Sequence, residues 1–560
     1  MLISKLKIVK FLLHDSFHKY LLLFPLGFLS SFFDLISIGL VLPLISFIVK
    51  PDGEYENIPD DFNRIMELFK SNFSLEGICI LMLVVIVLKN IFVFLIANES
   101  YKITNKIRGQ WMNNLFVMYT YSNYKLFVER KHGDLLNNLF TLTSDGLKGL
   151  KELVNMFMFS ITVLFSLIVL FLISWKVTLV ILLITSLFYF FLQKPLTKGA
   201  VTLGSLRIKY YQNVQSIPND AFKGMREIKT YSAEQNVINE YYNAVLEMVK
   251  LRIKLFLYQI LPSVFPEIIL ITLFCITIIY LNRFSVSPLS NYFPFLITYL
   301  YASQRLFVNA GNLVKSFLVF SANKPAINYL NHEMSSYYYD DVTQGNRLLK
   351  GTEVNLNIEN LSFSYNDNAE VIKGLSIGFK KGEFIAIVGG SGAGKSTLAD
   401  LILRLYDPSS GSIHFDGINI CEYDLLDWRK RIGFVSQDTF LFNGTIRDNI
   451  CLGQSGEISD IKIIEASKKA NAHDFIMNTE KGYDTIVGER GAKFSGGQRQ
   501  RISLSRALVR KPEILILDEA TSALDSYNEQ LVMKGIRSRM QDIILIVIAH
   551  RLSTIVGANK

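Results

Sequence analysis

The sequence predicts two domains of different classes, an all-α membrane domain with six transmembrane helices followed by a soluble α/β domain. Hydrophobic residues make up 50% of the 560 residues and charged residues only 19%, whereas a soluble chain carries about 25% charged residues. Lys and Arg outnumber Asp and Glu by 31 to 20 in residues 1–330, but number 27 against 29 in residues 331–560. Excess positive charge confined to the apolar half is typical of a membrane protein and argues against a nucleic-acid-binding protein.

Six apolar stretches are long enough to cross a bilayer, which takes about 20 residues. They are residues 21–49, 78–97, 156–173, 177–192, 257–281 and 292–320. Residues 1–20 alternate apolar side chains with lysines, which favours an interfacial amphipathic helix over a solvated leader. The long segments after the second and fourth spans are basic, whereas the segment after the first span is acidic. We therefore expect a multi-pass protein with the N-terminus, the basic segments and the second domain in the cytoplasm.

The domain boundaries follow from these patterns. We expect the interfacial helix at 1–20, the transmembrane domain with two long cytoplasmic loops at 21–325, a polar linker at 326–352 and the soluble domain at 353–560. The cytoplasmic loops have the pattern of helical continuations at 98–121 and 204–231, and helices that extend beyond the membrane need a surface to contact. We expect the elements that contact the soluble domain near 122–128 and 217–224.

The first functional motif of the soluble domain is a phosphate-binding loop. Phe384–Val388 is an apolar run typical of a buried parallel strand, and a helical pattern follows at Leu398–Leu405. Between them lie Gly389, Gly390, Ser391, Gly392, Ala393, Gly394, Lys395, Ser396 and Thr397. This is GxxxxGK[ST] in its required strand–loop–helix context, in which backbone amides cradle phosphates and the lysine reaches the β- and γ-phosphates. The domain is thus predicted to be a P-loop NTPase, with the Ser396 hydroxyl on Mg²⁺.

Two further apolar strands are predicted to end in acid–base residues. Ile514–Leu517 is followed by Asp518, which is placed to hold Mg²⁺ through water, and by Glu519, which is placed to act as general base on the attacking water. Ile543–Ala549 is followed by His550. Without other evidence, a histidine at the end of a strand is usually a residue that caps the strand at the protein surface. At the end of a third parallel strand, we expect His550 to contact the γ-phosphate instead.

Phe494-Ser-Gly-Gly-Gln498, which ends 20 residues before Asp518, resembles the signature motif of the ATP-binding-cassette (ABC) ATPases. Six spans followed by one cassette resemble an ABC half-transporter of the exporter type. The resemblance implies that Tyr365 stacks on adenine, that Gln437 contacts Mg²⁺ and the membrane domain, that Thr485–Gly491 touches the cytoplasmic helices and that Asp525 lies in the D-loop. The cofactors it implies are ATP and Mg²⁺. Cassettes of this family usually continue further than ten residues past His550, so the resemblance implies a cassette that lacks its usual C-terminal end.

The resemblance also implies a partner. Ser495, Gly496, Gly497 and Gln498 at a helix N-terminus face the phosphate loop of another cassette in this family. Because one chain holds one phosphate loop and one signature, we expect a homodimer, with a heterodimer as the alternative. The family implies export or flipping at the bacterial inner membrane.

Mid-span charges are the candidates for a cargo site, because each costs roughly 2.5–3.5 kcal/mol on insertion scales. They are Asp34, Lys89, Glu267 and Arg305. Two interpretations stay open: salt bridges that only hold the bundle together, such as Asp34 with Lys89, or a cavity whose cations meet an anionic head group. The layout resembles the bacterial lipid-linked oligosaccharide flippase, including a segment at 59–71 long enough for a short external helix. The alternative cargoes are another lipid, a drug or a peptide, and a remote alternative is a membrane-tethered regulatory ATPase.

Overall fold

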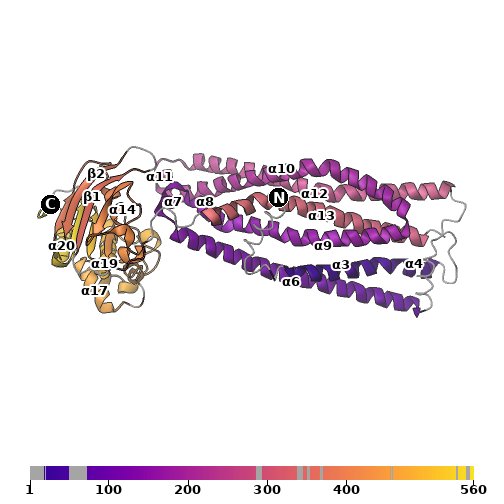
Figure 1. The fold of residues 1–560 in the computed structure, drawn as a ribbon, viewed down its shortest axis with the longest axis horizontal. Helices are drawn as coiled ribbons and strands as arrows, with labels where there is room; N and C mark the ends of the chain where they lie inside the picture. The colour runs from indigo at the N-terminus through magenta and orange to yellow at the C-terminus, as the bar shows by residue number, and fades with distance from the viewer. Residues whose placement is uncertain are drawn as a thin grey trace. The chain divides into compact units, whose positions relative to one another are not determined.

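The computed structural model describes residues 18, 21–49, 72–284, 293–336, 345–349, 354–365, 370–454, 456, 458–537, 540–549 and 555–560. The predicted interfacial helix at 1–20 (apart from residue 18), the predicted external helix at 59–71 and the parts of the linker at 337–344 and 350–352 lie outside these residues. The chain divides into a helical unit, Met1–Ser122 with Glu129–Tyr338, and a cassette unit, Asn123–Val128 with Tyr339–Lys560. Figure 1 shows the two units as a set of long helices and a mixed α/β body.

The helical unit is built from long helices, as predicted. Its elements are α3 (Leu23–Gly39), α4 (Val41–Val49), α6 (Leu75–Tyr121), α8 (His132–Asn137), the π-helical turn η2 (Asn138–Leu142), α9 (Thr143–Ile173), α10 (Trp175–Lys223), α11 (Met225–Thr230), α12 (Glu234–Phe284) and α13 (Phe293–Ser336). The continuation predicted at 98–121 is confirmed within α6. The one predicted at 204–231 is interrupted, because α10 ends at Lys223 and a new helix begins at Met225.

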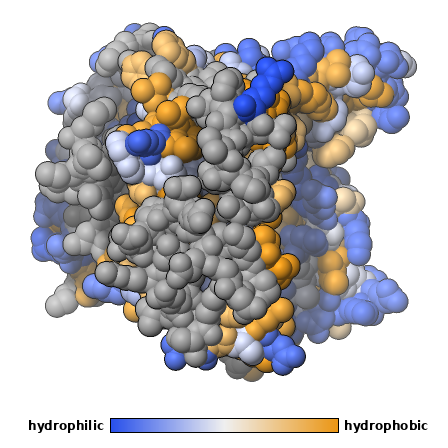
Figure 2. Space-filling view, turned by 90° about the vertical axis from the view of Figure 1, so that its right-hand side faces the viewer, coloured by the Kyte–Doolittle hydropathy of each residue, from blue (hydrophilic) through white to orange (hydrophobic). Residues whose placement is uncertain are grey.

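Within the described residues, three helical stretches are both long and apolar enough to cross a membrane: Leu23–Val49, Leu75–Tyr121 and His132–Ile173. Figure 2 faces the right-hand end of Figure 1 and shows hydrophobic residues at the surface. On α6, Ile80 is 64% exposed, Leu83 63% and Phe94 69%. Large apolar side chains exposed along a helix fit a lipid surrounding rather than water.

Helices α9 and α13 pack closely because glycines remove side chains at their contact. A Cβ on Gly146 would lie 2.8 Å from Leu330 Cδ1, and one on Gly149 would lie 3.0 Å from Ile327 Cδ1. Side chains at either position would force the helices apart, since packed interiors have few voids.

A buried polar group, which we call the closed cluster, consists of Tyr119, Arg130, Asn138 and Glu333. Arg130 Nη1 donates to Glu333 Oε1 at 2.6 Å, and the Tyr119 hydroxyl donates to the same oxygen at 3.1 Å. Asn138 Nδ2 lies 3.0 Å from the Tyr119 hydroxyl and 3.4 Å from Glu333 Oε1. The Glu333 side chain is only 1% exposed. The carboxylate therefore connects α13 to α6, to η2 and to Arg130, the residue that follows the short helix α7 (Tyr124–Glu129).

The cassette unit holds two four-stranded sheets. The antiparallel sheet has the order β2-β1-β4-β5, with β1 (Asn355–Phe363), β2 (Ile372–Lys380), β4 (Ser410–Phe415) and β5 (Ile418–Asn419). The parallel sheet has the order β3-β8-β7-β6, with β3 (Phe384–Ile387), β6 (Ile432–Val435), β7 (Ile514–Asp518) and β8 (Ile544–Ile548). The three predicted strands are β3, β7 and β8, and all are buried or nearly so, as expected for parallel strands.

Helices complete the cassette unit. They are α7 (Tyr124–Glu129), α14 (Lys395–Ile402), α15 (Leu425–Lys430), α16 (Ile446–Ile450), α17 (Asp460–Lys469), α18 (His473–Met477), α19 (Gly496–Val509) and α20 (Ser526–Arg537), with short 3-10 turns η4 (Ile420–Glu422), η5 (Gly482–Asp484), η6 (Glu489–Gly491) and η7 (Met540–Asp542). The helix after the phosphate loop begins three residues earlier than predicted, at Lys395, and ends before the left-handed Arg404 (φ +52°). At the chain end, Asn559 N donates to Phe384 O at 2.7 Å, alongside β3.

Candidate functional site

The phosphate loop lies between β3 and α14, as predicted. Gly392 and Gly394 have φ values of +80° and +83°, a left-handed conformation that glycine adopts without strain. The loop curls round the lysine side chain, because Lys395 Nζ donates to Gly389 O at 3.0 Å and to Gly390 O at 2.8 Å. An ammonium group is therefore held inside a ring of backbone at a helix N-terminus, which is an arrangement for phosphate binding.

Strand order brings the predicted acid–base residues to the same edge as this loop. β7 pairs with β8 and β6, and β8 pairs with β3, all in parallel, so their carboxyl ends meet. Asp518 is the last residue of β7, and Glu519 follows in a left-handed conformation with φ +48°. Gln437 follows β6, and its Nε2 donates to Glu519 Oε2 at 2.7 Å. The structure thus joins two residues that are 82 positions apart in the sequence. The third strand, β8, ends at Ile548, one residue before the predicted end at Ala549, and His550 lies outside the described residues.

The oxygen donors at this edge suit Mg²⁺. Asp518 is buried, with 7% of its surface exposed, and Ser396 is the second residue of α14. Burial, together with the Asp518 carboxylate, raises the pKa of Asp400 to about 6, so negative charge is concentrated here. Mg²⁺ prefers hard oxygen ligands and keeps several waters, so a site needs only one or two carboxylates plus substrate phosphates. Ser396, Asp518 and the Gln437 amide oxygen fit this description.

Tyr365 lies beside the same loop. Its hydroxyl is 3.1 Å from Thr397 Oγ1 on α14, and the residue is 37% exposed. An aromatic ring is therefore anchored to the phosphate-loop helix while part of it stays accessible.

The signature segment forms the N-terminus of α19. The Ser495 hydroxyl accepts from Gln498 N at 3.2 Å, and Gln498 Oε1 accepts from Ser495 N at 2.9 Å, which is a capping box. A Cβ on Gly497 would lie 3.0 Å from Ala523 O, so only glycine lets the two segments approach this closely. Asp525 caps the next helix through Asn528 N at 2.7 Å, and these hydrogen bonds lower its pKa. The side chains of Ser495 and Gln498 thus satisfy backbone N–H groups at the N-terminus of α19.

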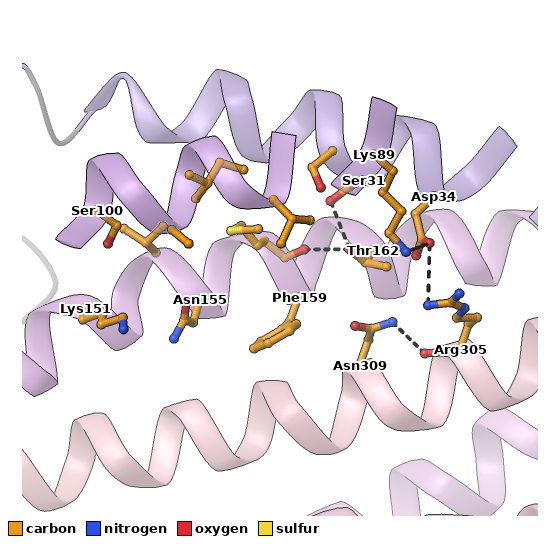
Figure 3. A pocket seen from close by; sticks show the side chains of 16 residues that line it. Ser31, Asp34, Lys89, Ser100, Lys151, Asn155, Phe159, Thr162, Arg305 and Asn309 are labelled. Carbon is orange, nitrogen blue, oxygen red and sulfur yellow. Dashed lines mark hydrogen bonds and ion pairs between the residues drawn. The ribbon is translucent and has the colours of Figure 1, made fainter. Parts of the chain in front are cut away.

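The helical unit contains a cavity of about 360 Å³ between α3, α6, α9 and α13 (Figure 3). Three of the four predicted mid-span charges, the cavity cluster of Asp34, Lys89 and Arg305, meet in it. Lys89 Nζ forms an ion pair with Asp34 Oδ1, and Arg305 Nη1 lies 3.8 Å from the same oxygen. The fourth, Glu267, belongs to α12, and its side chain lies outside what the structure describes.

Both interpretations of these charges find support. The salt bridge between Asp34 and Lys89 is confirmed, and Asp34 is 4% exposed. Arg305, however, is 37% exposed in its side chain and also donates to the Tyr301 hydroxyl at 2.9 Å. The charged residues among the described lining of the cavity are Asp34, Lys89, Arg305 and Lys151, which gives this lining a formal charge of +2. The Glu152 carboxylate lies next to it and accepts from Asn155 Nδ2 at 3.0 Å.

The sequence analysis missed part of this lining. Lys151, Asn155, Phe159 and Thr162 all line the cavity from α9. Their spacing of i, i+4, i+8 and i+11 places them on one face of a helix. Lys151 and Asn155 precede the third span predicted at 156–173, so a search for polar residues at helical spacing that began before this span could have detected Lys151, Asn155 and Thr162. Ser31 on α3 faces this row, with its Oγ 3.0 Å from Thr162 Oγ1.

These features together define an ATP-binding domain joined to a membrane domain with a polar cavity. Comparison with known proteins agrees: residues 22–304 match the ABC transporter transmembrane region, and residues 372–522 match the ABC transporter family. The chain belongs to the ABC transporter family. Its cassette is an ATPase domain that binds ATP with Mg²⁺, and its two domains in one chain form an exporter-type half-transporter.

Individual relatives show the range of this family. The chain is 32% identical over 442 residues to Heterocyst differentiation ATP-binding protein HepA of Nostoc sp., covering 78% of this chain and 70% of that protein. It is 44% identical over 219 residues to Leptomycin B resistance protein pmd1 of Schizosaccharomyces pombe, covering 39% of this chain but only 16% of that protein. A bacterial Atm1-family ABC exporter with ATP bound has a similar fold, with a TM-score of 0.77, 25% identity and coverage of 96% and 91% of the two chains.

Proposed function

We propose that two copies of this chain form an ATP-driven exporter of the bacterial inner membrane that flips a polyprenyl-pyrophosphate-linked oligosaccharide. The observation that carries the choice of cargo is the +2 formal charge of the described lining of the membrane cavity. Charges are costly inside a membrane domain, so its cations attract an anionic group more strongly the less water surrounds them. A pyrophosphate head group matches that charge, and the apolar walls around Val93 and Ile96 suit a lipid chain.

We assign the ATP site by position. Lys395 and the loop amides hold the phosphates, Tyr365 stacks on the base, and Ser396, Asp518 and Gln437 hold Mg²⁺, which neutralises phosphate charge when bound. Glu519 accepts a proton from the attacking water, with its carboxylate oriented by Gln437 Nε2 at 2.7 Å. His550 contacts the γ-phosphate. The signature at Ser495–Gln498 completes the site on the partner cassette, with Asp525 beside it.

The role of Glu519 is tested by Glu519→Gln, which keeps the shape of the side chain but removes the base. We expect ATP hydrolysis to fall by about 10²–10⁴-fold while ATP binding persists. Glu480→Gln, at an exposed position of the same unit, is the matched control and should hydrolyse ATP normally. Hydrolysis at the wild-type rate by Glu519→Gln would remove this residue from the mechanism.

The cargo is tested by stimulation of ATP hydrolysis in reconstituted vesicles. We expect a polyprenyl pyrophosphate to stimulate hydrolysis, and the same polyprenol without phosphate, or a hydrophobic cation, to have little effect. Export of a drug is the second candidate, because Phe159 and Met158 give the cavity an apolar, aromatic wall. Stimulation by the hydrophobic cation but not by the pyrophosphate would favour that second function and reject the first.

A further inference from the structure

Four aromatic rings connect the candidate base-binding position to α7. Tyr365 lies edge-on to Tyr406, with ring centroids 5.3 Å apart at 90°. Tyr406 lies edge-on to Tyr124, with centroids 6.1 Å apart at 84°. Phe363 supports both, at 4.9 Å from Tyr365 and 5.6 Å from Tyr406. All these distances lie in the range of favourable aromatic pairs.

The two ends of this row differ from its middle. Tyr406 is 8% exposed and Phe363 is 5% exposed, so the central rings are fixed by packing. Tyr365 is 37% exposed and Tyr124 is 46% exposed. The accessible face of Tyr365 lies beside the phosphate loop through Thr397, whereas Tyr124 is the first residue of α7.

Helix α7 is a short element of the chain between α6 and α8, yet residues Asn123–Val128 group with the cassette unit. Leu126 is buried, with 7% of its surface exposed. The edge contact between Tyr124 and Tyr406 therefore joins α7 to the cassette unit, and Tyr406 in turn contacts Tyr365 at the nucleotide site.

We propose that Tyr406 and Tyr124 are positioning residues for the nucleotide base, through which a base stacked on Tyr365 stabilises the docking of α7. A stacked base restricts the ring of Tyr365, and this ring in turn fixes the edge contact with Tyr406 and so with Tyr124. Coupling between two sites is reciprocal, so docked α7 must also increase the affinity for the base. The proposal rests on ATP binding at the phosphate loop, as proposed above, but not on the identity of the cargo.

The reciprocal effect is measurable in the purified full chain without cargo. Loss of one aromatic contact is worth about a 2- to 12-fold change in affinity. We expect Tyr406→Leu and Tyr124→Leu each to raise the KM for ATP by this factor with kcat unchanged. Inorganic tripolyphosphate, which has no base, should inhibit each variant with the wild-type Ki. Tyr406→Phe and Tyr124→Phe keep the ring and should restore the wild-type KM.

The control is Tyr121→Leu, which removes an exposed tyrosine three residues before Tyr124 and should leave the KM unchanged. Because Tyr124 is half exposed, its variants keep the test usable even where Tyr406→Leu fails to fold. A wild-type KM for ATP in Tyr124→Leu overturns the proposal. So does an equal rise in the ATP KM and the tripolyphosphate Ki, which indicates general damage to the phosphate loop. Failure of cargo stimulation with these KM shifts present would reject only the cargo.

Discussion

Three buried carboxylates of the described helical unit, Asp34, Asp145 and Glu333, pair with basic residues. Two of them, Glu333 and Asp34, differ in what surrounds the pair. In the closed cluster, the carboxylate of Glu333 has one cation, Arg130, and two neutral partners, Tyr119 and Asn138. In the cavity cluster, Asp34 faces two cations and opens on a space of about 360 Å³. The closed cluster pairs one carboxylate with one cation, whereas the cavity cluster has an excess of cations and opens on a cavity.

This difference separates structural from functional ion pairs better than burial does, since Glu333 and Asp34 are 1% and 4% exposed in their side chains. A balanced ion pair has no excess charge to attract a ligand, so we expect its main effect to be on the stability of the fold. Among the described residues that line the cavity, cations outnumber carboxylates three to one, so an incoming anion can compensate the excess positive charge. The comparison predicts that substitutions in the two clusters will affect different properties.

The largest effect is expected in the closed cluster. Arg130→Gln leaves the Glu333 carboxylate buried without a cation, and losing one partner of a buried pair costs about 3–5 kcal/mol. The free energy of unfolding in denaturant measures this loss. The double variant Arg130→Met with Glu333→Leu removes both charges and should be more stable than the single variant. A single variant as stable as wild type would show that the cluster does not hold the helices.

In the cavity cluster, Arg305→Gln should affect transport and not stability. Asp34 keeps its ion pair with Lys89, so we expect a stability change within about 1 kcal/mol. Transport per ATP hydrolysed should fall at least about tenfold, because a hydrogen bond to a charged group contributes about 1.5–3 kcal/mol. Lys102→Gln is the control, since Lys102 pairs with Glu99 on the exposed surface of α6. Unchanged transport in Arg305→Gln would mean that the cavity cluster, like the closed cluster, has only a structural role.

Lys89→Gln tests whether the ion pair between Lys89 and Asp34 leaves Arg305 available to bind cargo. With Lys89 gone, Asp34 should attract Arg305 from its present 3.8 Å, so we expect a moderate stability loss of about 1–2 kcal/mol and weaker cargo binding. Adding Asp34→Asn releases Arg305 and should restore cargo binding. Cargo binding that stays equally weak in the double variant would mean that Lys89 itself contacts the cargo.

The smallest effect is expected at Lys151, which lies on α9 and is exposed. Exposed charges contribute about 0.2–1 kcal/mol, and salt screens them. Lys151→Gln should therefore lower the transport rate at low salt by less than about fivefold, with no difference from wild type at high salt. A loss that persists at high salt would place Lys151 in direct contact with cargo.

The sequence predicts most of the nucleotide site because its residues are close to one another along the chain or end strands. Gly389–Thr397 form one continuous segment of loop and helix start, and Asp518 and Glu519 lie at the end of a strand that an apolar run reveals. The mid-span charges Asp34, Lys89 and Arg305 were also detectable, because lipid makes them costly. Their pairing was not determined by the pattern, since it depends on helix rotation and depth.

The closed cluster shows what local patterns cannot predict. Glu333 and Arg130 are 203 residues apart, and each lies in a polar stretch where a charged side chain has no special cost. Only the tertiary structure brings Tyr119 and Asn138 to the same carboxylate. The aromatic row from Tyr365 to Tyr124 was likewise undetectable, because aromatic residues are common in this chain and their edge contacts have no fixed spacing.

Equilibrium binding of a polyprenyl pyrophosphate to the purified, nucleotide-free protein tests the central claim most directly. Wild-type protein should bind this lipid in preference to the unphosphorylated polyprenol. Arg305→Gln should bind the pyrophosphate at least about tenfold more weakly and bind the polyprenol as wild type does. Equal affinity of wild type and Arg305→Gln for the pyrophosphate would contradict the assignment of the cavity to an anionic head group.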